Sequence, residues 1–600
     1  MTRSLIMSRR DLEFLLYEWL DVVSLTKRER FAEHDRDTFD AVLDLSEALA
    51  TEYFAPLNRK ADLQEPFVGP DGAVEMIPEI AAAMAAYTKS GLPASTFDAS
   101  LGGMQLPLTV HHAASSYFQA ASVGAYAYPF LAAGNANLVV AHGTAQQIEQ
   151  FAQPIIDGRW YGTMALSEPQ AGSSLGDITT RAILQDDGTY RLHGTKMWIS
   201  TGDHELGDNI VHLVLAKTPD APPGVKGISL FIVPKHLVNE DGSIGERNDV
   251  ALVGLNHKMG FRATTNTLLN FGEGLTKPGD KAGAVGYLIG DQGRGLSLMF
   301  HMMNEARISV GAGAVALGYT GYLHSLAYAE VRAQGRPVDA KDPATPQARI
   351  IDHPDVRRML LAQKSYAEGG LALILFCARL VDEEETAETE VERERAHTLL
   401  EVLTPIAKSW PSQWCLAAND LAIQIHGGSG YTRDFAVEQF YRDNRLNPIH
   451  EGTHGIHGLD LLGRKVTING GSGFTLLLDT MRKTATSARA CEGAVGVYAE
   501  TLNVAIERLE AVTRELWAGG DPAVALANAS LYLEAAGHVV VAWVWLEQLL
   551  SVGDNTGNFY EGKRAAAQYF FRFELPTIYP KLDLLASLDR TTLDLDPATL

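Results

Sequence analysis

The sequence predicts a mainly α-helical protein with a small β-domain in the middle of the chain. Apolar residues recur at helical spacing up to about residue 155, and short β-branched runs bounded by Gly, Pro and Asp follow between about 160 and 290. The helical pattern then returns and continues to residue 600. At roughly 100–200 residues per domain, this length suggests about three to five units. We expect an N-terminal helical domain at 1–158, a middle β-domain at 159–290, a helical bundle at 291–466 and an additional C-terminal helical domain at 467–600.

The N-terminal helices are predicted from apolar residues that mix with acids at helical spacing, over Leu12–Leu20, Ala81–Thr88 and Leu108–Gln119. The strands of the middle domain are predicted at His212–Ala216 and Gly227–Val233. Two further runs, Tyr190–His193 and Lys196–Ser200, flank a Gly-Thr pair, which predicts a hairpin.

The second helical part is predicted to begin with a long helix over Leu296–Arg332, whose small residues allow close helix packing. The segment Gly335–Pro354 has four prolines and is expected to be a loop. The Glu-rich segment Asp382–Glu394 is typical of a solvated helix face or a connection. A Gly-rich break at Asn469–Gly473 precedes the appended helical domain.

Composition excludes several classes of protein. Apolar residues make up 46% and charged residues 20% of the sequence, as is ordinary for a globular protein. The net charge of −23 argues against a nucleic-acid partner or a membrane-surface binder, because both need basic patches. Three distant cysteines suggest neither a disulfide framework nor a thiolate metal site, and a reducing compartment fits best.

No targeting or membrane segment is expected. Four acidic residues interrupt the apolar stretch near the N-terminus, so no signal-peptide core forms. The best apolar run, Val539–Leu546, is far shorter than the roughly 18 residues of a membrane helix. We therefore expect a cytoplasmic protein with no integral membrane segment.

Three short motifs match known patterns in letters but not in context. Residues 172–176 match G-x-S-x-G, but a loop precedes them, whereas a nucleophile elbow needs a strand before the serine and a helix after it. Residues 311–318 resemble a dinucleotide fingerprint, but they lie within a predicted helix, which favours helix packing. Residues 450–454 match H-E-x-x-H, yet Pro448, Gly452 and Gly455 predict a turn where a zinc protease needs a helix.

A fourth motif is much longer. Residues 424–451 read QIHGGSGYTRDFAVEQFYRDNRLNPIHE and are followed by GTHGIHG. This stretch resembles the acyl-CoA dehydrogenase family, whose members have a Q-x-x-G-G-x-G-Y segment, a V-E-x-x-x-R-D segment and Y-E-G-T in this order and spacing.

The resemblance covers about residues 70–465. Leu166–Ser173 is similar to the family's T-E-P-x-A-G-S loop and Gly194–Ser200 to its G-x-K-x-W-I-[ST] strand, and Lys258–Arg262, Asn304–Gly311 and Tyr328–Gly335 also match. The resemblance implies the family's fold: an N-terminal helical domain, a β-barrel-like middle domain and a C-terminal four-helix bundle. The segment after 467 would be an extra helical domain.

The resemblance also implies a reaction, the FAD-dependent α,β-dehydrogenation of an acyl-CoA thioester to the 2-enoyl-CoA. Glu451 matches the family's catalytic base, and burial of such a carboxylate raises its pKa toward working pH. The backbone N–H of Glu451 is expected to bind the thioester oxygen together with a flavin hydroxyl, as an oxyanion hole does.

The matched motifs imply further binding residues. The expected cofactor-binding residues are Leu166, Ser167, Trp198, Ser200, Arg332, Gln334, Gln424, Gly427, Gly428, Thr453 and Gly455. The expected substrate-binding residues are Ser173, Asn304, Arg307 and Gly452. Arg332 and Gln334 are expected to reach the FAD of a neighbouring subunit, and no metal site is expected.

The sequence departs from the family pattern in three places. His450 stands where the family usually has Tyr, which could alter the pKa of the neighbouring base. The aromatic residue between Gln334 and Gly335 is missing, and Asn304 stands where an Asp is common. None of these departures removes the base.

The N-terminal segment Arg10–Glu18, the extension after 470 and Asn558–Pro580 resemble a long bacterial subgroup. That subgroup includes 3-methylthiopropanoyl-CoA dehydrogenases and broad-range fatty-acyl-CoA dehydrogenases, so a short thioether and a longer aliphatic acyl chain both stay open. An electron-transfer flavoprotein is the expected electron acceptor, and a homodimer the expected assembly. The alternatives are an acyl-CoA oxidase, a non-dehydrogenating flavoprotein and a zinc hydrolase acting through residues 450–454.

Overall fold

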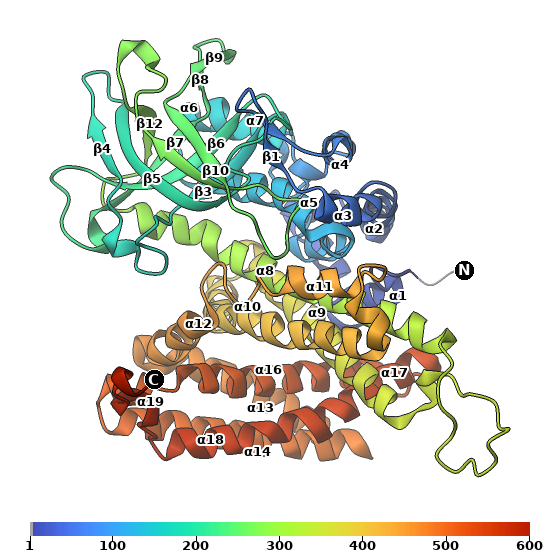
Figure 1. Ribbon diagram of the computed structural model, residues 1–600. Helices are drawn as coiled ribbons and strands as arrows, with labels where there is room; N and C mark the ends of the chain where they lie inside the picture. Colours follow the sequence, from blue (N-terminus) through green and yellow to red (C-terminus); the bar gives the residue numbers. More distant parts are fainter. Residues whose placement is uncertain (1–3) are drawn as a thin grey trace. The chain divides into compact units, whose positions relative to one another are not determined.

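The computed structural model describes residues 4–600, apart from the side chain of Asn304 (Figure 1). Contacts between residues divide the chain into two compact units. The first consists of Arg307–Leu600, Pro107–Ala120 and the described part of Met1–Asp40, and is helical. The second consists of Ala41–Leu106 and Ala121–Ala306 and contains every strand of the described chain.

The second unit is built around an eight-stranded sheet that closes on itself. Its strands are β3 (Tyr161–Ala165), β4 (Arg181–Leu184), β5 (Tyr190–Ser200), β6 (Ile210–Lys217), β7 (Ile228–Pro234), β10 (Val250–Leu255), β11 (Asn266–Phe271) and β12 (Ala284–Ile289). The strands pair in the order β10-β11-β5-β12-β7-β6-β3, and β4 pairs with both β5 and β6. The ring β5-β12-β7-β6-β4 is therefore closed, which gives the expected barrel-like domain.

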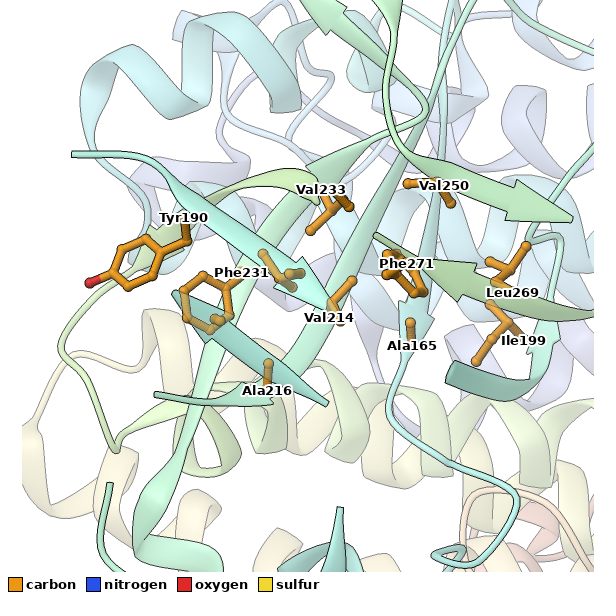
Figure 2. Packing of buried hydrophobic residues seen from close by; sticks show 13 residues of the cluster. Ala165, Tyr190, Ile199, Val214, Ala216, Phe231, Val233, Val250, Leu269 and Phe271 are labelled. Atoms are coloured by element: carbon orange, nitrogen blue, oxygen red, sulfur yellow. The ribbon is translucent and has the colours of Figure 1, made fainter. Parts of the chain in front are cut away.

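The interior of this barrel is filled by apolar side chains from successive strands (Figure 2). Val214 from β6, Phe231 from β7, and Leu269 and Phe271 from β11 are all fully or almost fully buried. Two short hairpins lie outside the main sheet, formed by β1 (Phe67–Val68) with β2 (Val74–Glu75), and by β8 (His236–Val238) with β9 (Ile244–Arg247).

The hairpin predicted within residues 190–200 is wrong, because these residues form the single strand β5. Its first half pairs with β4 and β12, and its second half with β11. Gly194 is needed where the strand changes partners, since a Cβ atom there would lie 2.4 Å from Thr180 Oγ1. The glycine marks a close approach of β5 to the residue just before β4, and not a turn.

The helices before the barrel include a long one, α5, whose N-terminus is capped by a carboxylate far along the sequence. In chain order they are α1 (Arg9–Glu13), α2 (Arg36–Leu49), α3 (Ala55–Leu63), α4 (Pro78–Lys89), α5 (Leu108–His142), α6 (Ala145–Gln147) and α7 (Gln153–Ile156). The buried Asp382 accepts hydrogen bonds from the backbone N–H groups of Leu108 (2.7 Å) and Thr109 (3.0 Å) at the start of α5. Asp382 is thus a helix cap, although its Glu-rich surroundings suggested a solvated segment.

The first unit contains three long helices: α8 (Gly295–Val331), from Arg307 onward, α9 (Pro354–Thr386) and α10 (Glu390–His426). The small residues of α8 lie against α10, as the sequence predicted. A Cβ atom on Gly311 would lie 2.1 Å from Ala407 O, and one on Gly318 would lie 2.7 Å from Cys415 Cβ. Helix packing therefore accounts for the glycines of residues 311–318, and no strand precedes them as a dinucleotide fingerprint requires.

The remaining helices are α11 (Val437–Asn444), α12 (His454–Asp460), α13 (Ser472–Arg489), α14 (Ala494–Ala518), α15 (Pro522–Leu526), α16 (Ala529–Val552), α17 (Asn558–Tyr569), α18 (Ile578–Ala586) and α19 (Thr591–Asp594). Helices α13, α14, α16 and α18 run side by side, with α16 packed against the other three (Figure 1). This extra helical domain follows the family-like part of the chain, as expected.

Helix α16 is the one candidate for a membrane span among the described residues. Its length and composition meet the criteria for a span, although its longest uninterrupted apolar run, Val539–Leu546, is far shorter than a membrane helix. Its apolar window is 83% buried by other parts of the protein, which is typical of a core helix.

Candidate active site

Glu451 lies in the turn between α11 and α12 and has an unusual backbone conformation. Its φ angle is +53°, in the left-handed region that residues other than glycine rarely adopt, and Gly452 follows with φ of +94°. A Cβ atom on Gly452 would lie 2.7 Å from Nε2 of His457, so only glycine fits. Strained backbone of this kind is found at functional sites, where the surrounding structure holds it.

Two buried side chains hold this turn by its carbonyl groups. Lys408 on α10 donates from Nζ to the carbonyl oxygens of Gly452 (2.6 Å) and Asn447 (2.8 Å). His457 on α12 donates from Nε2 to the carbonyl oxygen of Glu451 (3.0 Å). The base candidate is therefore fixed from both sides through its backbone.

Burial and the neighbouring charges have opposite effects on the pKa of Glu451. Burial raises the pKa of Glu451, while the nearby cations Arg307 and Lys408 lower it, and burial prevails. Burial also lowers the pKa of Lys408 to about 7. A carboxylate with a raised pKa beside cations is the arrangement expected of a general base that works near neutral pH.

His450, the departure from the family's Tyr, is held as a neutral ring. Burial, and secondly the charge of Lys408, lower its pKa to about 3. Its Nε2 atom lies 3.0 Å from Oδ1 of Asn447. The imidazole therefore adds a neutral hydrogen-bonding group beside the base and no charge at neutral pH.

Arg307, predicted to contact the substrate, lies in this charge cluster. It is almost fully buried, and its Nη1 atom is 3.5 Å from Oδ2 of Asp460 on α12. Arg464 also contacts Asp460, at 3.2 Å. Asn304 cannot be placed in the same way, because its side chain is outside the described part of the structure.

The H-E-x-x-H reading fails on geometry. His450 and Glu451 lie in the turn, and α12 begins only at His454, so the two histidines do not share a helix face. His454 instead faces Ser409, whose hydroxyl lies 2.6 Å from Nδ1. In the described part of the chain, no three His, Cys, Asp or Glu side chains gather as metal ligands would.

The predicted flavin loop of the second unit is tied to β5. The carbonyl oxygen of Leu166 accepts from Lys196 Nζ (2.9 Å), and that of Ser167 accepts from the backbone N–H of Met197 (3.0 Å). These bonds bring Leu166 and Ser167 alongside the end of β5 that includes Trp198 and Ser200. Ser173 lies further along the same loop and is exposed.

Glu168 anchors this loop from the inside. Its carboxylate accepts hydrogen bonds from the backbone and hydroxyl groups of Thr179 and Thr180, at 2.6–3.0 Å, and forms a buried ion pair of 3.0 Å with Lys196. Burial alone would raise its pKa, but Lys196 and these hydrogen bonds lower the pKa to about 2. Glu168 is thus a structural anion and not a candidate base.

Trp198 is an exposed aromatic residue with an unusual backbone conformation. It lies at a bulge in the β5–β11 pairing, with φ of +67°, and 58% of its surface is exposed. Ser200, two residues on, accepts from Asn266 Nδ2 at 3.2 Å. An exposed indole on strained backbone, beside a firmly anchored loop, fits the flat ring of a flavin.

Five of the predicted cofactor-binding residues lie in a separate exposed region of the first unit, at the C-terminal ends of α8 and α10. Tyr328 and His426 stack with ring centroids 4.3 Å apart, and Phe435 packs against both rings. The stack joins the two segments that contain the predicted residues, which are Arg332, Gln334, Gln424, Gly427 and Gly428, all exposed. A Cβ atom on Gly427 or Gly428 would meet nothing within 4 Å, so a phosphate group has room to approach the backbone there.

Thr453 and Gly455 lie at the start of α12. Thr453 caps this helix by accepting from the backbone N–H of Ile456 (3.4 Å). Gly455 is the second residue of α12, where a Cβ atom would come no closer than 3.8 Å to Ser530 Oγ.

Sequence reasoning missed Lys408 and His457, the two residues that hold the base turn. A signal was present for Lys408, since it interrupts the apolar run Leu399–Trp410, and a lysine there needs buried partners. No comparable signal marked His457, because its partner is a backbone carbonyl.

Three family models match the chain. Residues 163–269 match the acyl-CoA dehydrogenase middle domain, and residues 293–466 match the acyl-CoA dehydrogenase C-terminal domain. Residues 477–596 match a domain described as acetyl-CoA dehydrogenase C-terminal like.

Known relatives match over most of the chain. A 3-methylmercaptopropionyl-CoA dehydrogenase of Ruegeria pomeroyi is 37% identical over 547 residues, which cover 89% of each chain. A butyryl-CoA dehydrogenase of Syntrophomonas wolfei is 32% identical over 98% of this chain and 97% of its own. The broad-specificity linear acyl-CoA dehydrogenase FadE5 of Mycobacterium tuberculosis is 32% identical over 98% of each chain.

Solved structures share the fold. An acyl-CoA dehydrogenase from Bacillus anthracis, complexed with FAD, has a TM-score of 0.71 at 18% identity, covering 98% of this chain and 92% of its own. ACDH-11 of Caenorhabditis elegans, in complex with C11-CoA, has a TM-score of 0.70 at 19% identity, covering 93% and 89%. At these identities the likeness concerns the fold alone.

Proposed function

The chain belongs to the acyl-CoA dehydrogenase family, and on that premise we propose that it oxidises an acyl-CoA thioester to the 2-enoyl-CoA with Glu451 as the base. The observation that supports this most is the turn at Glu451. A carboxylate whose pKa is raised by burial lies on left-handed backbone, within the electrostatic influence of the cations Lys408 and Arg307. Such a group is suited to removing a weakly acidic proton from a carbon next to a thioester.

The backbone at Glu451 supports a second role. Among the described residues, none accepts a hydrogen bond from its N–H group, so this donor is available to a ligand. We propose that it binds the thioester oxygen, because charge develops on that oxygen as the α-proton leaves. Lys408 and His457 keep the donor in place by holding the neighbouring carbonyls.

FAD, when bound, supplies the acceptor for the hydrogen of the β carbon. Leu166, Ser167, Trp198 and Ser200 would hold its ring, with Thr453 and Gly455 as further contacts. The exposed cluster of Arg332, Gln334, Gln424, Gly427 and Gly428 would hold the adenosine-diphosphate part of a cofactor from a second copy of the chain. A homodimer follows from this proposal. Light scattering of the purified protein, and FAD retention by Arg332→Ala, test it.

The proposal is tested by the visible spectrum of the purified protein during anaerobic addition of acyl-CoA. The flavin absorption should bleach with the wild type, and stay intact with Glu451→Gln, which keeps the size of the side chain but not its basicity. If the protein binds FAD but none of the added thioesters bleaches the flavin absorption, the protein is instead a non-dehydrogenating flavoprotein.

The acyl chain is proposed from the relatives' substrates. We expect activity with 3-methylmercaptopropionyl-CoA or with short linear acyl-CoAs such as butyryl-CoA. A panel of linear thioesters of increasing length, with the thioether included, ranks these by kcat/KM. Ser173, Arg307 and Gly452 are the described residues that we propose to contact this substrate.

We propose an electron-transfer flavoprotein as the acceptor that reoxidises the flavin. Oxygen consumption during turnover distinguishes this from the oxidase alternative. Turnover that needs an added electron-transfer flavoprotein and consumes no oxygen supports the dehydrogenase, whereas stoichiometric hydrogen peroxide supports the oxidase. A cytoplasmic location stays a prediction from the sequence.

A further inference from the structure

Helix α12, which follows the base turn directly, rests on the extra C-terminal domain. Gly458 of α12 faces the start of α16 so closely that a Cβ atom on it would lie 2.7 Å from Ala529 O and 3.0 Å from Ser530 N. Backbone approaches backbone here, with no side chain between the two helices. Any displacement of α16 would therefore be passed to α12 and to the turn before it.

A polar chain links the same two helices. His454, three residues after Glu451, has its Nδ1 atom 2.6 Å from the hydroxyl oxygen of Ser409, which leaves its second ring nitrogen for another partner. That nitrogen, Nε2, lies 3.6 Å from Oε1 of Glu534 on α16. Glu534 in turn is paired with Lys581 of α18 at 2.5 Å.

Helix α10 supports the base turn and the C-terminal domain with three consecutive residues. Lys408 donates to the carbonyl of Gly452, Ser409 faces His454, and Trp410 donates from Nε1 to Nδ1 of His538 on α16 (3.2 Å). All three are almost fully buried. Helices α10 and α16 thus both contact the segment that runs from the base turn into α12.

We propose that the C-terminal domain is part of the catalytic apparatus, with His454 and Glu534 as positioning residues that set the orientation of the base turn. This inference rests on the proposed role of Glu451. The ion pair with Lys581 holds the Glu534 carboxylate beside His454, and the imidazole transfers that restraint to the start of α12. A base must be held to within a fraction of an ångström of its productive position, so a support of this kind affects proton removal more than substrate binding.

The test compares Glu534→Gln with Glu547→Gln. Both residues are half-buried on α16, but Glu547 lies thirteen residues further along, or about 20 Å from Glu534, and contacts Thr484 instead of the α12 segment. Both changes remove one carboxylate charge from the same helix. Only the first touches His454.

Three quantities are measured for each variant holoenzyme: kcat and KM with the best acyl-CoA, the kinetic isotope effect with α-deuterated substrate, and hydrogen–deuterium exchange of peptides covering residues 447–458. Glu534→Gln should lower kcat by on the order of tenfold to a hundredfold with little change in KM, raise the isotope effect and speed exchange of the turn. Glu547→Gln should change none of these. His454→Asn keeps the acceptor for Ser409 but loses the group that faces Glu534, so it should match Glu534→Gln, and the double variant should be no worse than either single one.

Equal behaviour of Glu534→Gln and Glu547→Gln in all three measurements would overturn the inference. The exchange measurement does not need turnover, so it separates the two proposals. An inactive wild type whose turn still loosens only in Glu534→Gln would refute the proposed reaction and support the role of the C-terminal domain.

Discussion

Replacing Glu168 with Gln should weaken the flavin loop by a predictable amount. The carboxyl group has a pKa of about 2 in place of 4.5, a difference that corresponds to about 3 kcal/mol of stability above pH 4.5. The buried ion pair gives a second value, since removing one partner of such a pair costs about 3–5 kcal/mol by leaving Lys196 uncompensated. The two values agree, and we expect the variant's second unit to be destabilised by about 3–4 kcal/mol.

The effect also depends on pH with a definite sign. The pKa of Glu168 is lowered by folding, so its contribution is complete above about pH 4.5 and is lost as the pH falls toward 2. The wild type should lose this stability in that window, and Glu168→Gln should have nothing further to lose there. Hydrogen–deuterium exchange of peptides from β3 to β5, measured against urea concentration, reports the unit's stability separately from the rest of the chain.

A matched control is Glu246→Gln in the same unit. Glu246 is exposed and accepts one hydrogen bond, from the backbone N–H of Gly279 (2.9 Å), so its loss should change stability by less than about 0.5 kcal/mol. The double variant Glu168→Gln/Lys196→Met should recover part of the loss, because no buried charge is left unpaired. A Glu168→Gln protein within about 1 kcal/mol of the wild type, with FAD still bound, would refute the reasoning.

Three other predictions concern the base and the helix that follows it. Glu451→Gln should keep the fold and the flavin absorption but slow anaerobic bleaching by at least about 10²–10⁴-fold, as stopped-flow absorbance would measure; bleaching at the wild-type rate would remove Glu451 from its role. The wild-type rate should fall as the pH is lowered, through a pKa above 4.5, because the base acts in its ionised form and burial raises its pKa. Lys408→Met should shift this acidic limb of the pH–rate profile to higher pH, because the lysine charge favours the ionised carboxylate. An unshifted limb would show that the lysine charge does not act on the base. Gly458→Ala should lower the stability by about 1–3 kcal/mol, visible as a lower Tm, because the added methyl group would lie 2.7 Å from Ala529 O. Gly455→Ala on the same helix meets nothing closer than 3.8 Å and should not lower the Tm, so equal effects of the two changes would contradict the packing described here.

Much of the architecture was accessible from the pattern of the sequence, because local periodicity reports which faces of an element are buried. The long helix over Gly295–Val331 and its packing through Gly311 are examples, since the run of small residues has meaning only if another helix lies against it. Strand β5 shows the limit. Gly194 and Thr195 have the composition of a turn, but the strand continues because β4 and β11 pair with its two halves, and no local pattern contains those partners.

In the candidate site, too, some residues could be predicted from the sequence and others only from the structure. A long motif identified the segment around Glu451, and the same reasoning selected Trp198, because functional positions are marked by residue types in a fixed order. The residues that hold these positions came only from the structure. Lys408 acts on carbonyl groups, and Asp382 caps a helix that begins 274 residues earlier, so neither partner can be read from the sequence.

Helix α16 has a consequence for how the chain is made. It is apolar on nearly all sides and emerges from the ribosome late, after its partners α9, α10, α12, α13 and α14 but before α17 and α18. Most helices that pack against α16 have therefore been synthesised before it. The side that α17 and α18 cover stays exposed until some 30 further residues have been synthesised, a delay of about 2–6 s at typical translation speeds. During that interval the uncovered side of α16 exposes apolar surface to water, as the lipid-facing side of a membrane helix would outside its bilayer.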